Sequence, residues 1–309
     1  MYIIMAILGF SLLIIVHELG HFIMAKVNGI KVEEFSIGMG PEIFSKKGKE
    51  TQYSLRLFPI GGYVKMLGEE EVSDDERSFS SKSPLRRITV ILAGVIMNII
   101  FAIVAFSIII SNRGYTEARI SKLEPNTPAI ESGLQVGDKI LAIDGSRVFT
   151  TTDVSMGIQL SKGKTVDLLV NRNGKKENIK VTPRLVDKDG TQMYQVGFHY
   201  TPVENPTVLE SIKESFNETI SLVTQTYKGL KMMVTGKVNF KTDVGGPVTI
   251  IKMSGQAAKN GLMTLTYFLG FISINLAVFN LLPFPALDGG WTVILLIELI
   301  TRRKVPDKI

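Results

Sequence analysis

Two histidines near the start of the chain have the spacing of metal ligands. The segment His17-Glu18-Leu19-Gly20-His21 fits the pattern HExxH. On an α-helix, residues four apart differ in direction by about 40°, so the two imidazoles project from one face and both reach a single Zn²⁺ ion. Such an ion lowers the pKa of a bound water to about 7, and a neighbouring carboxylate takes its proton. The motif predicts metal-assisted hydrolysis with Glu18 as general base, and Gly20 leaves room for a neighbouring helix.

A zinc site of this kind needs a third protein ligand and leaves its fourth position to water. The chain has three histidines and no cysteine, so the third histidine, His199, is one candidate, although it lies in a polar region. Asp288 is the stronger candidate because it follows Pro283 and Pro285 between two apolar runs. Broken helical backbone at membrane depth is tolerated only where it is buried in protein or lines a wet cavity, and an acidic residue there indicates a functional site. The alternative for Asp288 is a helix cap at an ordinary turn.

The apolar residues gather in segments long enough to cross a bilayer. Mean hydropathy is positive, at +0.22. We predict transmembrane helices over residues 1–27 and 88–111, and a third over the apolar part of residues 262–300, which ends in a short further helix. Residues 1–27 lack the basic n-region and the cleavage site of a signal peptide. Gly94 and Asn98, four apart in the second helix, indicate close packing between helices.

The distribution of charge predicts how the chain crosses the membrane. The net charge is +6, and eleven Lys and Arg residues lie between Lys26 and Arg87, whereas no basic residue precedes the first helix. The positive-inside rule then places residues 28–87 in the cytoplasm and the polar region from residue 113 onward outside it. A basic chain is also compatible with nucleic-acid binding, but membrane proteins keep Lys and Arg beside their spans, which explains this charge without nucleic acid.

The segments between the helices contain strands and one amphipathic helix. Within residues 28–87, the stretch 52–66 alternates apolar and polar positions around Gly61-Gly62, which predicts a β-hairpin that either dips into the bilayer or stays in the cytoplasm. Residues 115–185 predict a soluble α+β unit. In residues 206–260, apolar residues recur at steps of three and four, so a helix there lies on the membrane surface or packs on a core.

Together these motifs resemble the site-2 proteases, a family of intramembrane zinc metalloproteases. The resemblance is closest to the bacterial branch of the regulator of sigma-E protease type, in which a PDZ domain is inserted between the second and third spans. It covers nearly the whole chain, and the pairing of HELGH with LDGG is its most specific feature. The residues that carry it are HELGH at 17–21, FSIGMGP at 35–41, GGYVKM at 61–66 and NLLPFPALDGG at 280–290.

The resemblance implies a polytopic α-helical membrane protein with an extracytoplasmic PDZ domain and a membrane-associated β-hairpin. It implies Zn²⁺ held by His17, His21 and Asp288, with Glu18 as the catalytic base. The hairpin would re-enter the membrane and pair with an unwound substrate by strand addition. Residues implied in substrate binding are Asn280, Gly61, Gly62, Tyr63, Pro283 and Pro285.

The PDZ resemblance rests on the stretch from Pro128 to Gly145, which contains the pattern PAxxxGLxxGDxILxIDG. Three interpretations of such a domain are open. It excludes large ectodomains, it recognises a chain terminus produced by an earlier cut, or it is only a spacer. Two departures from the family stand out. Trp291 occupies a position where many relatives have histidine, and relatives usually continue past the basic segment 302–304 into another transmembrane helix, so the resemblance predicts a helix beyond residue 309.

The expected function is hydrolysis of peptide bonds in membrane-spanning proteins. Expected substrates are single-span proteins of the plasma or inner membrane, such as anti-sigma factors or signal-peptide remnants, and no nucleic acid is expected. The alternative is a non-catalytic membrane scaffold that uses its PDZ domain to hold partners. A scaffold needs neither a set of metal ligands nor Glu18 beside them, and absence of bound metal would favour it.

Overall fold

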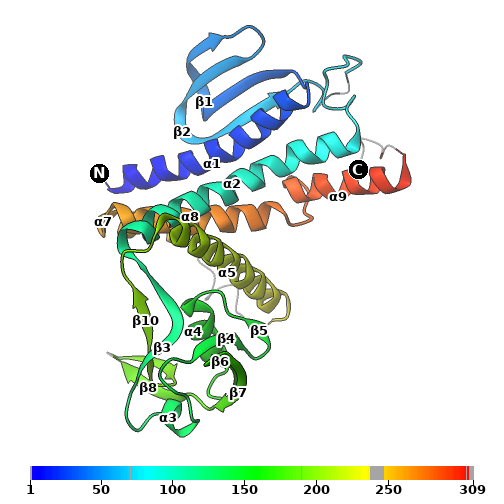
Figure 1. The fold of residues 1–309 in the computed structure, drawn as a ribbon. Helices are drawn as coiled ribbons and strands as arrows, with labels where there is room; N and C mark the ends of the chain where they lie inside the picture. The colour runs from blue at the N-terminus through cyan, green and yellow to red at the C-terminus, as the bar shows by residue number, and fades with distance from the viewer. Residues whose placement is uncertain are drawn as a thin grey trace. The chain divides into compact units, whose positions relative to one another are not determined.

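The chain forms two units. The computed structural model describes residues 2–69, 71, 73–188, 190–236, 247–303 and 305. The first unit comprises Met1–Ala105 and Thr226–Ile309, and the second comprises Phe106–Gln225. Figure 1 shows that long helices and one pair of strands make up the first unit, whereas the second contains the larger sheet.

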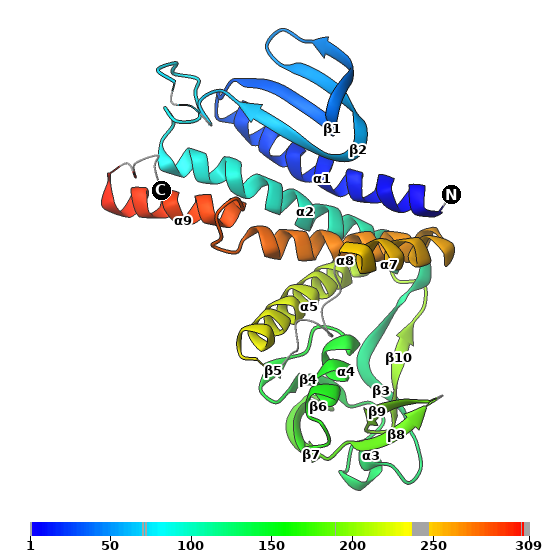
Figure 2. The same ribbon diagram turned by 180° about the vertical axis from the view of Figure 1, so that it is seen from behind.

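Three of the described helices are long and apolar enough to cross a membrane. They are α1 (Tyr2–Val27), α2 (Pro84–Arg113) and α8 (Leu262–Asn280). Helix α2 begins four residues before the predicted start at 88, with Pro84 in its first turn, where the missing N–H of proline costs no hydrogen bond. A shorter helix, α9 (Asp288–Thr301), follows α8 after an irregular turn. In both views α2 lies between α1 on one side and α8 followed by α9 on the other (Figures 1 and 2).

The strands of the first unit correct one prediction. Strands β1 (Val32–Lys47) and β2 (Gln52–Met66) form an antiparallel pair whose turn lies at residues 48–51, so a hairpin centred on Gly61-Gly62 is wrong. Both glycines continue the bent strand β2, where Gly62 pairs with Ile37. Gly61 has a φ of +87°, and a Cβ on Gly62 would lie 2.6 Å from the Ser36 carbonyl oxygen. The glycines therefore mark a bulge and a close strand contact, which alternation alone does not distinguish from a turn.

Apolar packing joins the elements of the first unit. Strand β2 runs along α1 in Figure 2, and buried side chains from α1, α2, α9 and both strands form one cluster. A buried ion pair between Arg87 of α2 and Glu298 of α9 fixes the far end of α9 against α2. Helix α7 (Pro247–Lys259) contacts α1 and α8 through a second cluster. That second cluster consists of Leu13, Ala257, Ala258, Leu265 and Leu269.

The second unit is built on a six-stranded sheet with the path β10-β3-β4-β6-β7, and β5 pairs with β4. Strand β10, outside the predicted range 115–185, pairs with β3 and extends the sheet toward residue 203. The sheet and helix α4 enclose an apolar core that includes Val154, Val166 and Leu168. The elements are β3 (Tyr115–Leu123), α3 (Pro128–Glu131), β4 (Lys139–Ile143), β5 (Ser146–Arg147), α4 (Thr151–Leu160), β6 (Val166–Arg172), β7 (Lys175–Val181), β8 (Arg184–Lys188), β9 (Thr191–Gln195) and β10 (Phe198–Val203).

Helix α5 (Val208–Val234) occupies the stretch where the periodicity predicted a helix. Its buried side chains are mostly small and polar, and Ser221 donates a hydrogen bond to Asp153 of α4. The apolar face is exposed instead, with Leu209 at 76% and Phe216 at 49% exposure. Packing of that face on a protein core is therefore wrong for the described residues, because the hydroxyl groups of the opposite face make the contacts.

Candidate metal centre

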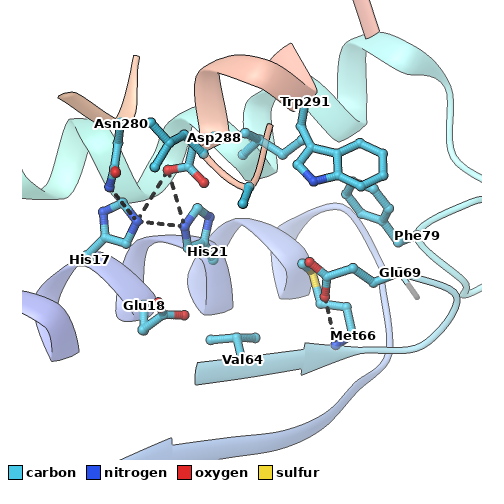
Figure 3. Close-up of a pocket in the computed structure, with 13 residues that line it drawn as sticks. His17, Glu18, His21, Val64, Met66, Glu69, Phe79, Asn280, Asp288 and Trp291 are labelled. Atoms are coloured by element: carbon cyan, nitrogen blue, oxygen red, sulfur yellow. Dashed lines mark hydrogen bonds and ion pairs between the residues drawn. The ribbon is translucent and has the colours of Figure 1, made fainter. Parts of the chain in front are cut away.

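Helices α1 and α9 bring the three predicted ligands together. The Nε2 atoms of His17 and His21 are 3.2 Å apart, and Asp288 Oδ2 lies 3.2 Å from the first and 3.7 Å from the second. All three ligand atoms lie within 4.8 Å of one another. Figure 3 shows the imidazoles rising from one face of α1 toward the carboxylate at the start of α9. The sequence separates these residues widely, and the fold joins them.

The donor set fits a tetrahedral zinc site. Zinc ligands at 2.0–2.1 Å from the ion, at tetrahedral angles, are roughly 3.3 Å from one another, close to the spacing of these three atoms. Asp288 Oδ2 is buried and accepts no hydrogen bond from the described residues, so its nearest neighbours are the two imidazole nitrogens. A buried carboxylate oxygen without a donor is costly unless a cation satisfies it. Two neutral imidazoles and one carboxylate are suitable ligands for zinc.

One face of α2 forms the back wall of the site. The Nδ1 atom of His21 lies 2.9 Å from the carbonyl oxygen of Val90, and donation there leaves Nε2 unprotonated for a metal. A Cβ on Gly94 would lie 2.5 Å from His21 Nε2 and 2.7 Å from His17 Cε1, so only glycine leaves space for both rings. Gly20 allows the helices this approach, since its Cβ would lie 2.3 Å from the Ala93 carbonyl oxygen. The prediction that Gly20 makes room for a helix is confirmed.

The turn between α8 and α9 places Asp288. Ala286 has a φ of +69°, and Asp288 follows in the first turn of α9, where a negative charge is favoured by the helix dipole. A Cβ on Gly289 would lie 2.3 Å from the Leu282 carbonyl oxygen, and one on Gly290 would lie 2.2 Å from that of Phe284. The two glycines therefore let α9 begin directly against the turn, which holds the carboxylate over α1.

Glu18 faces the same cavity as the ligand atoms. This cavity has a volume of about 270 Å³. Figure 3 shows Glu18 on α1 with Val64 of strand β2 beside the same cavity. The cavity is lined by His17, Glu18, His21, Val64, Met66, Glu69, Phe79, Ile91, Asn280, Ala286, Leu287, Asp288 and Trp291. An acid–base group and three metal-binding groups thus share one half-enclosed space between apolar helices.

The structure separates the residues predicted to bind substrate. Asn280, the last residue of α8, lines the cavity, and its Nδ2 lies 3.4 Å from His17 Nε2. Tyr63 instead accepts a hydrogen bond from Arg56 on the same strand. The other candidate ligand, His199, pairs with Glu124 in the second unit. Of the residues predicted to bind substrate, five do not line the cavity, and their role in binding stays a prediction. These are Gly61, Gly62, Tyr63, Pro283 and Pro285.

Several site residues were missed in the sequence. Glu69 and Trp291 line the cavity, and the Val90 carbonyl orients His21. Gly94 and Asn98 gave a signal, because their spacing indicated close packing, but that packing is against imidazoles as well as helices. A backbone carbonyl leaves no trace in the residue type at its position, so nothing at Val90 pointed to its role.

Comparison with known proteins places the chain in a family. The model of peptidase family M50 matches residues 5–309. The chain belongs to peptidase family M50. This is the site-2 protease family, so the resemblance found in the sequence is confirmed. Together with three helices able to cross a membrane, M50 membership identifies the chain as a membrane protein.

Two relatives match over nearly their whole length. A protein of Clostridium perfringens that is named a zinc metalloprotease is 54% identical over 308 residues, covering 100% of this chain and 91% of its own. The regulator of sigma-W protease RasP of Bacillus subtilis is 31% identical, covering 97% of this chain and 90% of its own. Among solved structures, a PDZ domain of an SdrC-like protein from Listeria innocua is 21% identical, covering 29% of this chain and 99% of its own, with a TM-score of 0.26. At that TM-score the last likeness assigns neither fold nor function.

Proposed function

We propose that the chain is a zinc-dependent endopeptidase that cleaves membrane-bound substrates at the cavity between α1, β2 and α9. One observation carries the proposal: three ligand atoms at tetrahedral spacing lie beside Glu18 in one cavity, and two of them belong to α1, a helix apolar enough to cross a membrane. M50 membership and the zinc metalloprotease names of the relatives support it. His17, His21 and Asp288 would hold the ion.

Glu18 would act as the general acid and base. When bound, zinc supplies Lewis acidity that polarises the scissile carbonyl and makes water a nucleophile at neutral pH. Glu18 takes the proton of the attacking water and returns it to the leaving amine. Asn280, whose amide lies beside His17, is placed to hold the substrate carbonyl.

Strand β2 is the proposed guide for the substrate. A helical peptide bond is shielded by its own hydrogen bonds and must be extended before water attacks it. Val64 and Met66 of β2 line the cavity, so a substrate segment extended along this strand would pass the ligands. This arrangement supports single-span membrane proteins as substrates, including anti-sigma factors and signal-peptide remnants, with residues 28–87 on the cytoplasmic side.

The sheet of the second unit is the proposed PDZ domain. It would lie outside the cytoplasm and either exclude large ectodomains or recognise a terminus left by an earlier cut. The sheet, the short helix α3 and the longer α4 support this assignment, although β10 carries the sheet beyond residue 185. Of the two uses, exclusion of ectodomains requires no ligand at the domain.

Substitution of Glu18 tests the mechanism. In the full chain reconstituted in lipid vesicles with a single-span substrate, Glu18→Gln should keep its zinc and lose cleavage by about 10²–10⁴-fold, because the amide accepts no proton. Glu69→Gln is the matched control, since Glu69 lines the same cavity without a place in the mechanism, and it should keep cleavage within about tenfold. Undiminished cleavage by Glu18→Gln would remove Glu18 from its role. A wild-type chain that binds no zinc would favour the scaffold.

A further inference from the structure

Asn98 is a buried polar side chain that α2 directs at the imidazole pair. Its exposure is 0%, and its Nδ2 atom lies 3.2 Å from His17 Nδ1. Its Oδ1 atom is buried and has no hydrogen-bond partner among the described residues. An incompletely paired carboxamide inside an apolar helix is unfavourable, and leucine would fill a similar volume without that cost. The position of the Asn98 amide beside His17 therefore indicates a role beyond packing.

The imidazole pair defines what that role requires. The Nε2 atoms of both histidines converge with Asp288, so in the metal-binding form each ring carries its proton on Nδ1. For His21 the Val90 carbonyl accepts that proton, with 2.9 Å between the two heavy atoms. The Nδ1 of His17 needs an acceptor on the same side of the site. If the Asn98 NH₂ faced this atom, two donors, the NH₂ and the His17 Nδ1–H, would point at each other.

The two ends of a carboxamide exchange places when the group turns by 180°, and its partner decides which end faces it. We propose that Asn98 presents Oδ1 to His17 and accepts the Nδ1–H, so that it positions the ring and leaves Nε2 free for the metal. The inference rests on the proposed zinc site.

The spacing along α2 gives the proposal a structural basis. Val90, Gly94 and Asn98 follow at intervals of four residues, which places them on one helix face. Along this face lie an acceptor for His21, a gap for both rings and an acceptor for His17. Ser273 of α8 donates a hydrogen bond to the Asn98 backbone carbonyl and fixes α2 at this level. This face of α2 thus orients both histidine ligands contributed by α1.

Zinc affinity of the purified full chain, measured by competition with a chromophoric chelator, tests this role. Asn98→Leu keeps the volume and removes the acceptor, and we expect about 10–100-fold weaker zinc binding. Asn98→Asp offers acceptors only, and we expect an affinity close to that of the wild type. Rescue by aspartate separates a hydrogen-bond role from packing, because a purely structural position would tolerate leucine better than a buried charge.

Ser254→Ala is the matched control, because Ser254 is also 0% exposed but lies in α7, where its hydroxyl bonds to its own helix and to no other described residue. It should bind zinc as the wild type does, and circular dichroism with excess chelator should show all variants folded. Wild-type affinity in Asn98→Leu, or equal weakening in Asn98→Asp or Ser254→Ala, would overturn the inference. If Asn98→Asp does not fold, the zinc affinity of Asn98→Leu relative to the wild type decides whether the inference holds. Absence of zinc from the wild type would instead refute the proposed function.

Discussion

Two carboxylates, one in each unit, differ in how the protein satisfies their buried oxygen atoms. Asp138 in the sheet unit is 1% exposed, and its two oxygens accept hydrogen bonds from the Arg172 guanidinium at 2.8 and 2.7 Å and from the Gln135 N–H at 2.9 Å. Asp288 has an equally buried Oδ2 that accepts no hydrogen bond from any described group and faces two imidazoles. Asp138 is satisfied by the protein, whereas Asp288 is arranged for a ligand.

The difference separates stability from function. Removing a satisfied buried carboxylate leaves its donors unpaired and destabilises the fold. Removing an unsatisfied one breaks no hydrogen bond of the metal-free fold, so the stability of that fold should change little while metal binding is lost. The three variants below test this contrast, from the largest expected effect to the smallest.

Asp288→Ala should abolish zinc binding. It removes one of three ligands, so cleavage of a reconstituted substrate should fall by more than the loss for Glu18→Gln, that is by more than about 10²–10⁴-fold. Thermal unfolding measured with excess chelator should match that of the metal-free wild type. Metal content by atomic absorption and unfolding by circular dichroism give both values. A variant that keeps stoichiometric zinc would contradict the ligand set. A variant that unfolds at a lower temperature than the metal-free wild type would show that Asp288 has a structural role.

Gly94→Ala should have the next largest effect. The new Cβ would lie 2.5 Å from His21 Nε2 and must displace the imidazoles, so we expect zinc affinity and cleavage to fall by about 10–100-fold, as when a ligand loses its orientation. Gly255→Ala is the control, because a Cβ at that helical glycine meets nothing within 4 Å. It should leave zinc affinity unchanged and stabilise α7 by about 0.5–1 kcal/mol. Equal zinc affinity for Gly94→Ala and wild type would show that the wall of α2 is not in contact with the ligands.

The sequence indicated the three candidate ligands that the structure brings together because each of them breaks a local rule. His17 and His21 interrupt an apolar helix, and Asp288 lies between two apolar runs beside prolines and glycines, so each stands out against the residues around it. The three long apolar helices followed from composition alone, because an apolar run of that length with few charged residues is typical of a membrane span. What these signals share is conflict with the local surroundings.

Features that conform to their surroundings escaped prediction. Alternation around Gly61-Gly62 fits both a hairpin and a bulged strand, and the partner β1 that decides between them is distant in sequence. The apolar stripe of α5 was compatible with the membrane surface or with a protein core, and the sequence did not show that hydroxyl groups on the opposite face bind α4. The Val90 carbonyl is invisible in any sequence. Long-range pairing and backbone groups therefore need the fold.

Asp138→Asn should have the smallest of the three effects and act on stability. The amide replaces one charge-assisted acceptor by a donor facing Arg172, which should lower the unfolding free energy of the sheet unit by about 2 kcal/mol. Zinc affinity should be unchanged. Hydrogen exchange of peptides from β3, β4 and β6 in the full chain, read by mass spectrometry, reports this unit, while exchange in α1 serves as the internal control. Wild-type protection of these strands in Asp138→Asn would show that Asp138 does not stabilise the sheet unit, and the contrast with Asp288 would be wrong.

The pH dependence sharpens this prediction. Burial alone would raise the pKa of Asp138, but the hydrogen bonds from Arg172 and Gln135 outweigh it and hold this pKa below its ordinary value. A group with a lowered folded-state pKa contributes stability above its unfolded pKa of about 3.9, and that contribution disappears as the pH falls through the folded value. The difference in protection between wild type and Asp138→Asn, normalised to intrinsic exchange, should therefore be full at pH 7 and shrink below about pH 4. A difference that grows on acidification would mean that the carboxylate is strained rather than satisfied, because only a raised folded-state pKa gives that sign.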